Sequence, residues 1–152
     1  MPVDTDKPAE ILLFDFLEEQ IEAAAAEDVL FDLELHDTIY QTITKPRGLR
    51  ISDAVGSMVP GGDGAIREHG VSVQLVCFAK VTGKDKKARQ PALTQVWELE
   101  KEMYRLLYQY NNLGGRVCDV EIEMGSRSYD VMNGEPYAVA NIPLVINPAA
   151  GY

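Results

Sequence analysis

Residues 71–81 read Val71-Ser-Val-Gln-Leu-Val-Cys-Phe-Ala-Lys-Val81, and this stretch decides the fold class. Every odd-numbered residue in it is apolar, whereas most of the even-numbered residues are polar. Alternation with a period of two predicts a β-strand that turns one face to the core. Val76 and Phe78 are apolar exceptions on the second face, which indicates a central strand or one covered by a partner.

A helix is predicted before this strand, over residues 8–27. Ile11, Phe14, Leu17 and Ile21 recur at helical spacing, and glutamates occupy the positions between them. The apolar residues predict a stripe that packs on the sheet.

A longer helix is predicted after the strand, over residues 91–112, because it opens with a proline and ends before an Asn-Gly stop signal. Its apolar positions at helical spacing are Leu93, Val96, Trp97, Met103, Tyr104, Leu107 and Tyr110. We expect the aromatic line formed by Trp97, Tyr104 and Tyr110 to lie in the core. Tyr108 falls off that line and is expected to contact a neighbour.

Three further strands are predicted from period-two alternation, over residues 29–35, 117–124 and 137–146. Turn signals stand at residues 125–128 and 133–136. Pro143 lies inside the last strand and has no N–H group to donate. That strand is therefore expected at an edge there, or with its donor side facing outward.

The region between residues 37 and 70 is harder to interpret. Short strands are conceivable near Ile39, Ile43 and residues 49–51. Residues 56–64 contain four glycines and a proline, so they predict a loop, and we expect a long flexible loop over about residues 52–70.

These elements predict a single α+β domain over residues 1–152. We expect a mixed or antiparallel sheet of about four to five strands, with two helices packed on one face.

Composition narrows the classes of function. The chain has 152 residues and a formal net charge of −10, which argues against a generic nucleic-acid-binding surface. No apolar run approaches the ~20 residues that span a bilayer, and the acidic start of the chain is not a secretory signal. The default compartment is the cytoplasm of the cell that makes the chain, in which Cys77 and Cys118 are expected to be reduced.

Catalytic motifs are not apparent. The two histidines, His36 and His69, are interpreted as surface or loop residues, and both cysteines lie in the middle of strands rather than on a nucleophile turn. Gly56 and Gly61 have the glycine spacing of a phosphate-binding loop, but Gly62 and Asp63 stand where it requires Lys and Ser or Thr. We therefore expect no enzyme activity and no cofactor.

Rows of carboxylates lie on one face of two predicted strands. They are Asp32 and Glu34 in the earlier strand and Asp119, Glu121 and Glu123 in the later one. If the two strands pair, the rows face each other and need water, a cation or a partner to compensate them. The first interpretation is a solvated outer face. The others are a Ca²⁺ or Mg²⁺ site in a small metal-dependent enzyme or metal-binding module, and the lining of a channel through which DNA passes.

A basic stretch lies between the central strand and the long helix. It contains five of the 14 Lys and Arg residues, namely Lys80, Lys84, Lys86, Lys87 and Arg89. It is interpreted as a solvated loop or as a docking patch for an acidic face of another subunit. Nucleic-acid binding ranks third, because no aromatic residues interleave with the lysines.

The order of these elements carries a likeness to a known family. The segments are residues 10–26, 29–35, 37–70, 71–81, 91–112 and 116–146, with the closing pattern Leu113-Gly114-Gly115, Val117-Cys118-Asp119-Val120-Glu121-Ile122 and Ala138-Val139-Ala140-Asn141-Ile142-Pro143-Leu144-Val145. This layout resembles the tail terminator (tail completion) proteins of long-tailed bacteriophages. The likeness is one of layout and covers nearly the whole chain.

The resemblance implies a structural virion protein of the tail and neck, assembled in the host cytoplasm. It implies a homo-oligomer, a hexameric ring, that caps the tail tube, stops its polymerisation and joins it to the head-side connector or stopper protein. DNA would pass through without specific binding, and no membrane is involved. In such a ring the basic stretch and the strand edge near Pro143 are expected at the subunit interface, and the carboxylate rows are expected at the lumen.

Overall fold

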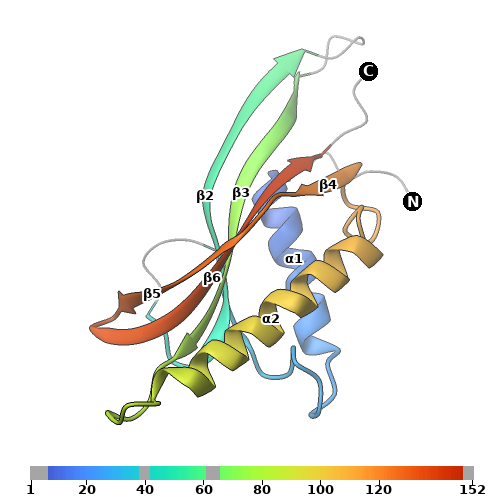
Figure 1. The fold of residues 1–152 in the computed structure, drawn as a ribbon. Helices are drawn as coiled ribbons and strands as arrows, with labels where there is room; N and C mark the ends of the chain where they lie inside the picture. Colours follow the sequence, from blue (N-terminus) through green and yellow to red (C-terminus); the bar gives the residue numbers. More distant parts are fainter. Residues whose placement is uncertain (1–6, 38–41, 61–65, 149–152) are drawn as a thin grey trace.

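The computed structural model describes residues 7–37, 42–60 and 66–148 and confirms an α+β fold with two helices and a mixed sheet (Figure 1). The elements in chain order are α1 (Ala9–Glu22), β1 (Glu34–His36), β2 (Arg47–Pro60), β3 (Ile66–Lys80), α2 (Arg89–Gln109), β4 (Asp119–Ile122), β5 (Ser126–Met132) and β6 (Glu135–Asn147). Six strands form one sheet, rather than the four to five expected from the sequence. None of the described helices is long and apolar enough to cross a bilayer.

The strands lie in the order β1-β2-β3-β6-β4, and β5 pairs with the same side of β6 as β4, at the other end of that strand. β1 is parallel to β2, and all other pairs are antiparallel. β3 pairs with both β2 and β6, so its prediction as a central strand is confirmed.

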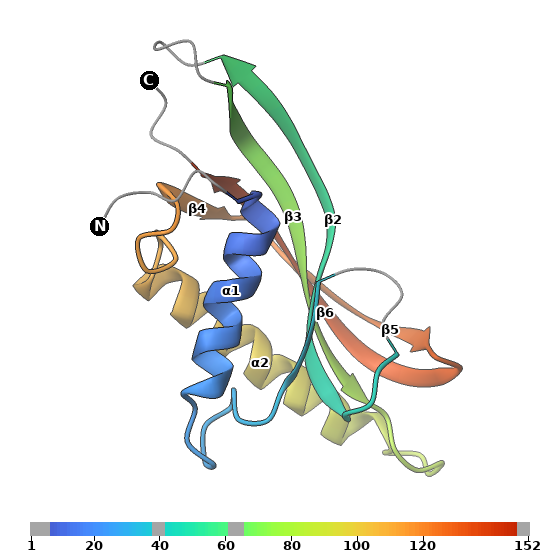
Figure 2. The ribbon, with the colours of Figure 1, turned by 180° about the vertical axis from the view of Figure 1, so that it is seen from behind.

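Both helices cover the same face of the sheet, as predicted (Figures 1 and 2). α1 contacts β1, β2 and β3, whereas α2 contacts β3, β6 and β4. The odd-numbered residues of β3 from Val71 to Ala79 face the helices and are all buried. Burial of this face follows directly from the period-two alternation in the sequence.

A smaller cluster is buried around Phe78, whose parity places it on the opposite face of β3. Phe78 is fully buried, and its ring packs against Tyr137 at 5.7 Å and against His36 at 6.3 Å between centroids. A Cβ at Gly48 would lie 2.7 Å from the Phe78 ring and 2.4 Å from the Glu34 carbonyl oxygen. Only glycine fits at position 48. The space that it leaves is filled by the Phe78 ring, and this explains why Phe78 is apolar on the otherwise polar face of β3.

The first helix is shorter than predicted, and Phe14, Leu17 and Ile21 of its predicted stripe pack on the core whereas Ile11 does not. It ends at Glu22, and the N–H of Ala25 donates to the Asp28 carboxylate at 3.0 Å in the turn that follows. Its buried residues are Ala9, Leu12, Leu13, Phe16 and Leu17. Ile11 remains 41% exposed, because two apolar stripes overlap in the sequence and the larger one faces the sheet.

Most of the predicted strand over residues 29–35 is not a strand. Only Glu34–His36 pairs with β2, and Asp32 has a positive φ of 57° that interrupts the extended chain. The Arg47 guanidinium accounts for the difference, since it binds the carbonyl oxygens of Val29 and Phe31. The backbone of this segment is thus held by a distant side chain rather than by a neighbouring strand.

The predicted loop over about residues 52–70 is largely a β-hairpin. β2 continues to Pro60 and β3 begins at Ile66, with residues 61–65 outside the described part. The register shifts between Ser52 and Val55 and again between Val55 and Ser57. Such bulges absorb residues that suit a strand poorly, so Gly56 does not end the strand.

The C-terminal prediction is partly confirmed. The turn at Asn133–Gly134 is present, with positive φ angles of 54° and 74°, but the predicted turn at residues 125–128 is replaced by β5. Pro143 lies in β6 between the stretch that pairs with β5 and the stretch that pairs with β4, so β6 is locally an edge there on its outer side, as predicted. The Pro143 carbonyl accepts the Glu123 N–H at 3.0 Å, so its missing donor faces the break between β4 and β5.

Candidate assembly surfaces

The two carboxylate rows do not meet. Asp32 and Glu34 lie at or beside β1, whereas Asp119, Glu121 and Glu123 lie at or beside β4. β1 and β4 are at opposite ends of the strand order, with β2, β3 and β6 between them. The pairing on which a joint metal site would depend is therefore wrong. In the described ranges no three His, Cys, Asp or Glu side chains are grouped to hold a metal ion.

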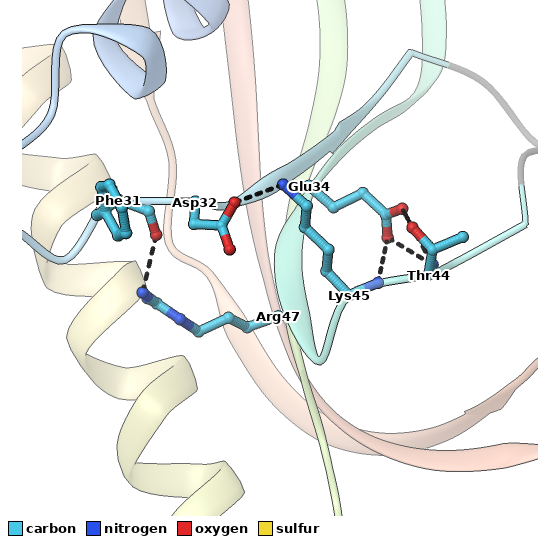
Figure 3. Close-up of polar contacts among 6 residues, drawn as sticks. All are labelled: Phe31, Asp32, Glu34, Thr44, Lys45 and Arg47. Carbon is cyan, nitrogen blue, oxygen red and sulfur yellow. Dashed lines mark hydrogen bonds and ion pairs between the residues drawn. The ribbon is translucent and has the colours of Figure 1, made fainter. Parts of the chain in front are cut away.

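Glu34 ties β1 to the chain that enters β2 (Figure 3). Its carboxylate accepts the Thr44 hydroxyl at 2.6 Å and the Thr44 N–H at 3.0 Å. Burial by itself would raise the pKa of Glu34, but the hydrogen bonds from Thr44 and the Lys45 N–H, together with the close approach of the His36 ring, outweigh it and lower the pKa. Glu34 is thus an anion fixed inside the fold rather than a residue facing a lumen.

One ion pair and contacts to the backbone complete the same cluster. The Lys45 ammonium lies 2.7 Å from the Asp32 carboxylate, and Arg47 reaches the Phe31 carbonyl at 3.0 Å (Figure 3). Because Lys45 neutralises Asp32, this edge offers no free acidic row.

His36 is buried, although the sequence indicated a surface residue. Only 4% of its side chain is exposed, and its Nε2 atom lies 3.1 Å from Glu34 Oε2. Neither ring nitrogen has a well-directed hydrogen bond. The residue was missed because the ring that covers it, Phe78, comes from β3, 42 positions along the chain, which no local pattern reveals. The side chain of His69 lies outside the described part.

The second carboxylate row remains largely free. Asp119 accepts a hydrogen bond of 2.6 Å from the Asn147 amide, but Glu121 and Glu123 are exposed. A solvated or lumenal surface is therefore possible for Glu121 and Glu123.

The basic stretch divides into two parts. Lys80 lies 3.7 Å from Glu135, and the Arg89 guanidinium lies 4.8 Å from the Tyr129 ring centroid. Lys84, Lys86 and Lys87 are exposed, and none of them forms an ion pair with any described residue. These three lysines, named here the basic loop, present unneutralised charge.

The ends of the sheet are open. β1 covers β2 only at Gly48–Arg50, and no described strand covers the outer side of β2 beyond that. At the other end, β5 pairs only with β6. We name these two regions the β2 side (α1, residues 23–33, β1 and β2) and the β5 side (residues 83–88, α2, β4 and β5).

Exposed large apolar residues occur on both sides. Those on the β2 side are Ile11, Phe31, Val55 and Met58. Those on the β5 side, within the described part, are Trp97, Tyr108, Tyr110, Met124, Tyr129 and Val131. Trp97 and Tyr110 were predicted in the core, and both are wrong, because α2 instead buries Leu99, Met103 and Leu106.

Neither a family model nor a curated protein is detectably similar to the chain.

Proposed function

We propose that this chain is a structural virion protein that forms a ring on the tail tube of a long-tailed bacteriophage, ends tube polymerisation and joins the tail to the head-side connector. The observation that carries the proposal is the pair of open sheet ends, one on the β2 side and one on the β5 side. The α+β layout expected from the resemblance is the second support.

A closed ring needs two different patches on different parts of each subunit, because each copy contacts its neighbours head to tail. The β2 side and the β5 side are such a pair, since they share no element. Both expose aromatic side chains and methionines, which are enriched in protein interfaces.

The distribution of charge also supports a head-to-tail contact between the β2 side and the β5 side. The net charge of −10 opposes self-association, so a ring needs local complementarity. The basic loop lies on the β5 side, and exposed glutamates of the β2 side, Glu18, Glu22 and Glu27, lie in and after the C-terminal half of α1. Figures 1 and 2 place residues 83–88 and the turn after α1 at the same end of the molecule. A head-to-tail contact would bring these opposite charges together.

The β2–β3 hairpin lengthens the β2 side of the proposed ring interface. β6 pairs with β3 only from Val71 onward, so the hairpin projects beyond the rest of the sheet (Figure 1). A two-stranded ribbon is marginally stable alone, and Val55 and Met58 are 69% and 61% exposed. We assign the outer edge of this arm to the contact with the next subunit, and Glu121 and Glu123 to a surface that repels passing DNA.

Light scattering and electron microscopy test the proposal. The purified chain, alone and after incubation with tail tubes of the same virus, should form a ring or cap one end of the tube. A protein that stays monomeric in both arms and leaves tube growth unchanged contradicts it.

A further inference from the structure

We infer that the outer edge of β2 in one copy pairs with the outer edge of β5 in the next, so that the sheet continues from subunit to subunit. This inference rests on the proposed ring and names the strands that close it. The occupant of each open edge is therefore a second copy of this chain.

The β2 edge offers a long run of backbone groups. β2 has 14 residues, and its only partner on the outer side, β1, ends its pairing at Arg50. Beyond Arg50 the described chain places no strand beside it. Unpaired N–H and C=O groups along an edge are a template for another strand.

The β5 edge is free in the same way. Met132 and Glu135 flank the two-residue turn and form a hydrogen-bonded pair, so alternate residues of β5 bond to β6. The N–H groups of Arg127, Tyr129 and Val131 consequently point away from β6. The Val131 N–H agrees with this geometry, since it donates to the exposed Asp130 carboxylate at 2.8 Å, a local bond that pairing with β2 would replace, whereas no such bond engages the N–H groups of Arg127 and Tyr129 within the described part.

β4 is a poorer partner at the same end of the sheet. It has four residues, against seven in β5. The Asn111 amide donates to the Val120 carbonyl at 2.7 Å, so a side chain already occupies a backbone acceptor of β4. We therefore assign the pairing to β5.

Side chains and charge favour the same match. Val55 and Met58 on β2, and Tyr129 and Val131 on β5, are exposed residues of the kinds that stabilise cross-strand pairs. Arg89 stacks on Tyr129, which places the start of α2 and the basic loop beside β5. The glutamates of α1 belong to the β2 side, so edge pairing brings unlike charges to one interface.

The bulges of β2 restrict which strand can fit. Register shifts on either side of Val55 bend β2. A bent edge pairs poorly with a flat strand, whereas the β5–β6 hairpin is itself curved (Figure 1). The bulges of β2 thus oppose pairing with flat strands, but they still permit pairing with the curved β5–β6 hairpin.

Val131→Pro tests the pairing, with Val131→Thr as the matched control. Proline removes an outward N–H and leaves the ladder with β6 intact, whereas threonine keeps both the N–H and the branched side chain. We expect V131P to fold with the wild-type circular dichroism spectrum, and its assembly to weaken by roughly tenfold or more, while V131T assembles normally. Hydrogen exchange of wild-type oligomer against monomer should show slowed amides in both residues 51–60 and residues 126–132.

The outcomes separate this inference from the proposed function. An oligomer in which either segment exchanges as fast as in the monomer, or a V131P protein that assembles like wild type, overturns the strand pairing and leaves the ring intact. A wild-type protein that never assembles overturns both.

Discussion

The Thr44 hydroxyl donates a hydrogen bond of 2.6 Å to the Glu34 carboxylate across the connection between β1 and β2. The same carboxylate accepts the Thr44 N–H (Figure 3). The Glu34 side chain thus makes, at this connection, a hydrogen bond to the backbone of the kind that a neighbouring strand would otherwise make. β1 has only three residues, and its position at the sheet edge depends on this anchor.

Glu34→Gln should therefore destabilise the fold. Glutamine keeps the shape but offers one acceptor oxygen and no charge, so the bonds to Thr44 and Lys45 weaken. Hydrogen bonds to a charged group contribute about 1.5–3 kcal/mol, and we expect a loss of about that size in the free energy of unfolding, measured by urea denaturation. Glu18→Gln is the control: Glu18 is exposed on α1, and a change beyond about 0.5 kcal/mol there would be unexpected.

The lowered pKa of Glu34 also predicts a pH dependence. A carboxyl whose pKa is lower in the folded chain than its ordinary value of 4.5 stabilises the fold above that value. The stabilisation is lost as the pH falls through the lower, folded pKa. We expect the difference in unfolding free energy between wild type and E34Q to be constant near neutral pH and to shrink below about pH 4.5. A difference that stays constant into the acid range would contradict this assignment.

His36→Phe should cost little or nothing. Both ring nitrogens of His36 are buried without a well-directed hydrogen bond, and the ring lies against Phe78. Phenylalanine removes only the poorly directed contact of Nε2 with Glu34, and that carboxylate keeps its bonds to Thr44 and Lys45, so the loss is small and is offset by burying an apolar ring. Thermal melting should give an unfolding free energy equal to that of wild type or up to about 1 kcal/mol higher.

The companion variant His36→Ala separates packing from polarity. It leaves a cavity beside Phe78, so we expect a loss of about 2–4 kcal/mol. If H36F is as damaging as H36A, the nitrogens of His36 are essential and this interpretation is wrong.

The sequence predicted those elements whose pattern is set by the core. β3 and β6 alternate because one face of each meets the helices, and the fold class followed from them. Residues 29–35 also alternate, but two of their carbonyl oxygens accept hydrogen bonds from Arg47, which lies 16 to 18 positions along the chain. No local window contains that contact.

Glycine and proline were less reliable as signals of where strands end than hydrophobic periodicity was as a signal of where strands lie. Gly56 is accommodated by bulges in β2, and Pro143 by a break between β4 and β5. Gly56 was interpreted as part of a loop, although pairing with β3 carries β2 past it, whereas Pro143 was placed inside its strand and lies at a local edge of β6 as expected. Of the candidate site residues, the basic loop stays exposed as expected. Asp32 and Glu34 are instead engaged by Lys45 and Thr44, in the connection between β1 and β2.

Reversing the basic loop should weaken assembly without unfolding the subunit. Lys84, Lys86 and Lys87 are exposed and form no ion pair with the described residues, so their replacement by Glu removes no contact from the monomer. In the ring, the same change would set like charges against the glutamates of α1. We expect the triple variant to melt like wild type and to remain monomeric in light scattering where wild type assembles. The triple Lys→Arg variant keeps the charge and should assemble. Added salt should weaken wild-type assembly, because salt screens the attraction between exposed charges and the Debye length is only about 8–10 Å. Normal assembly of the Glu variant would remove the basic loop from the interface, and the open strand edges would then have to hold the ring alone.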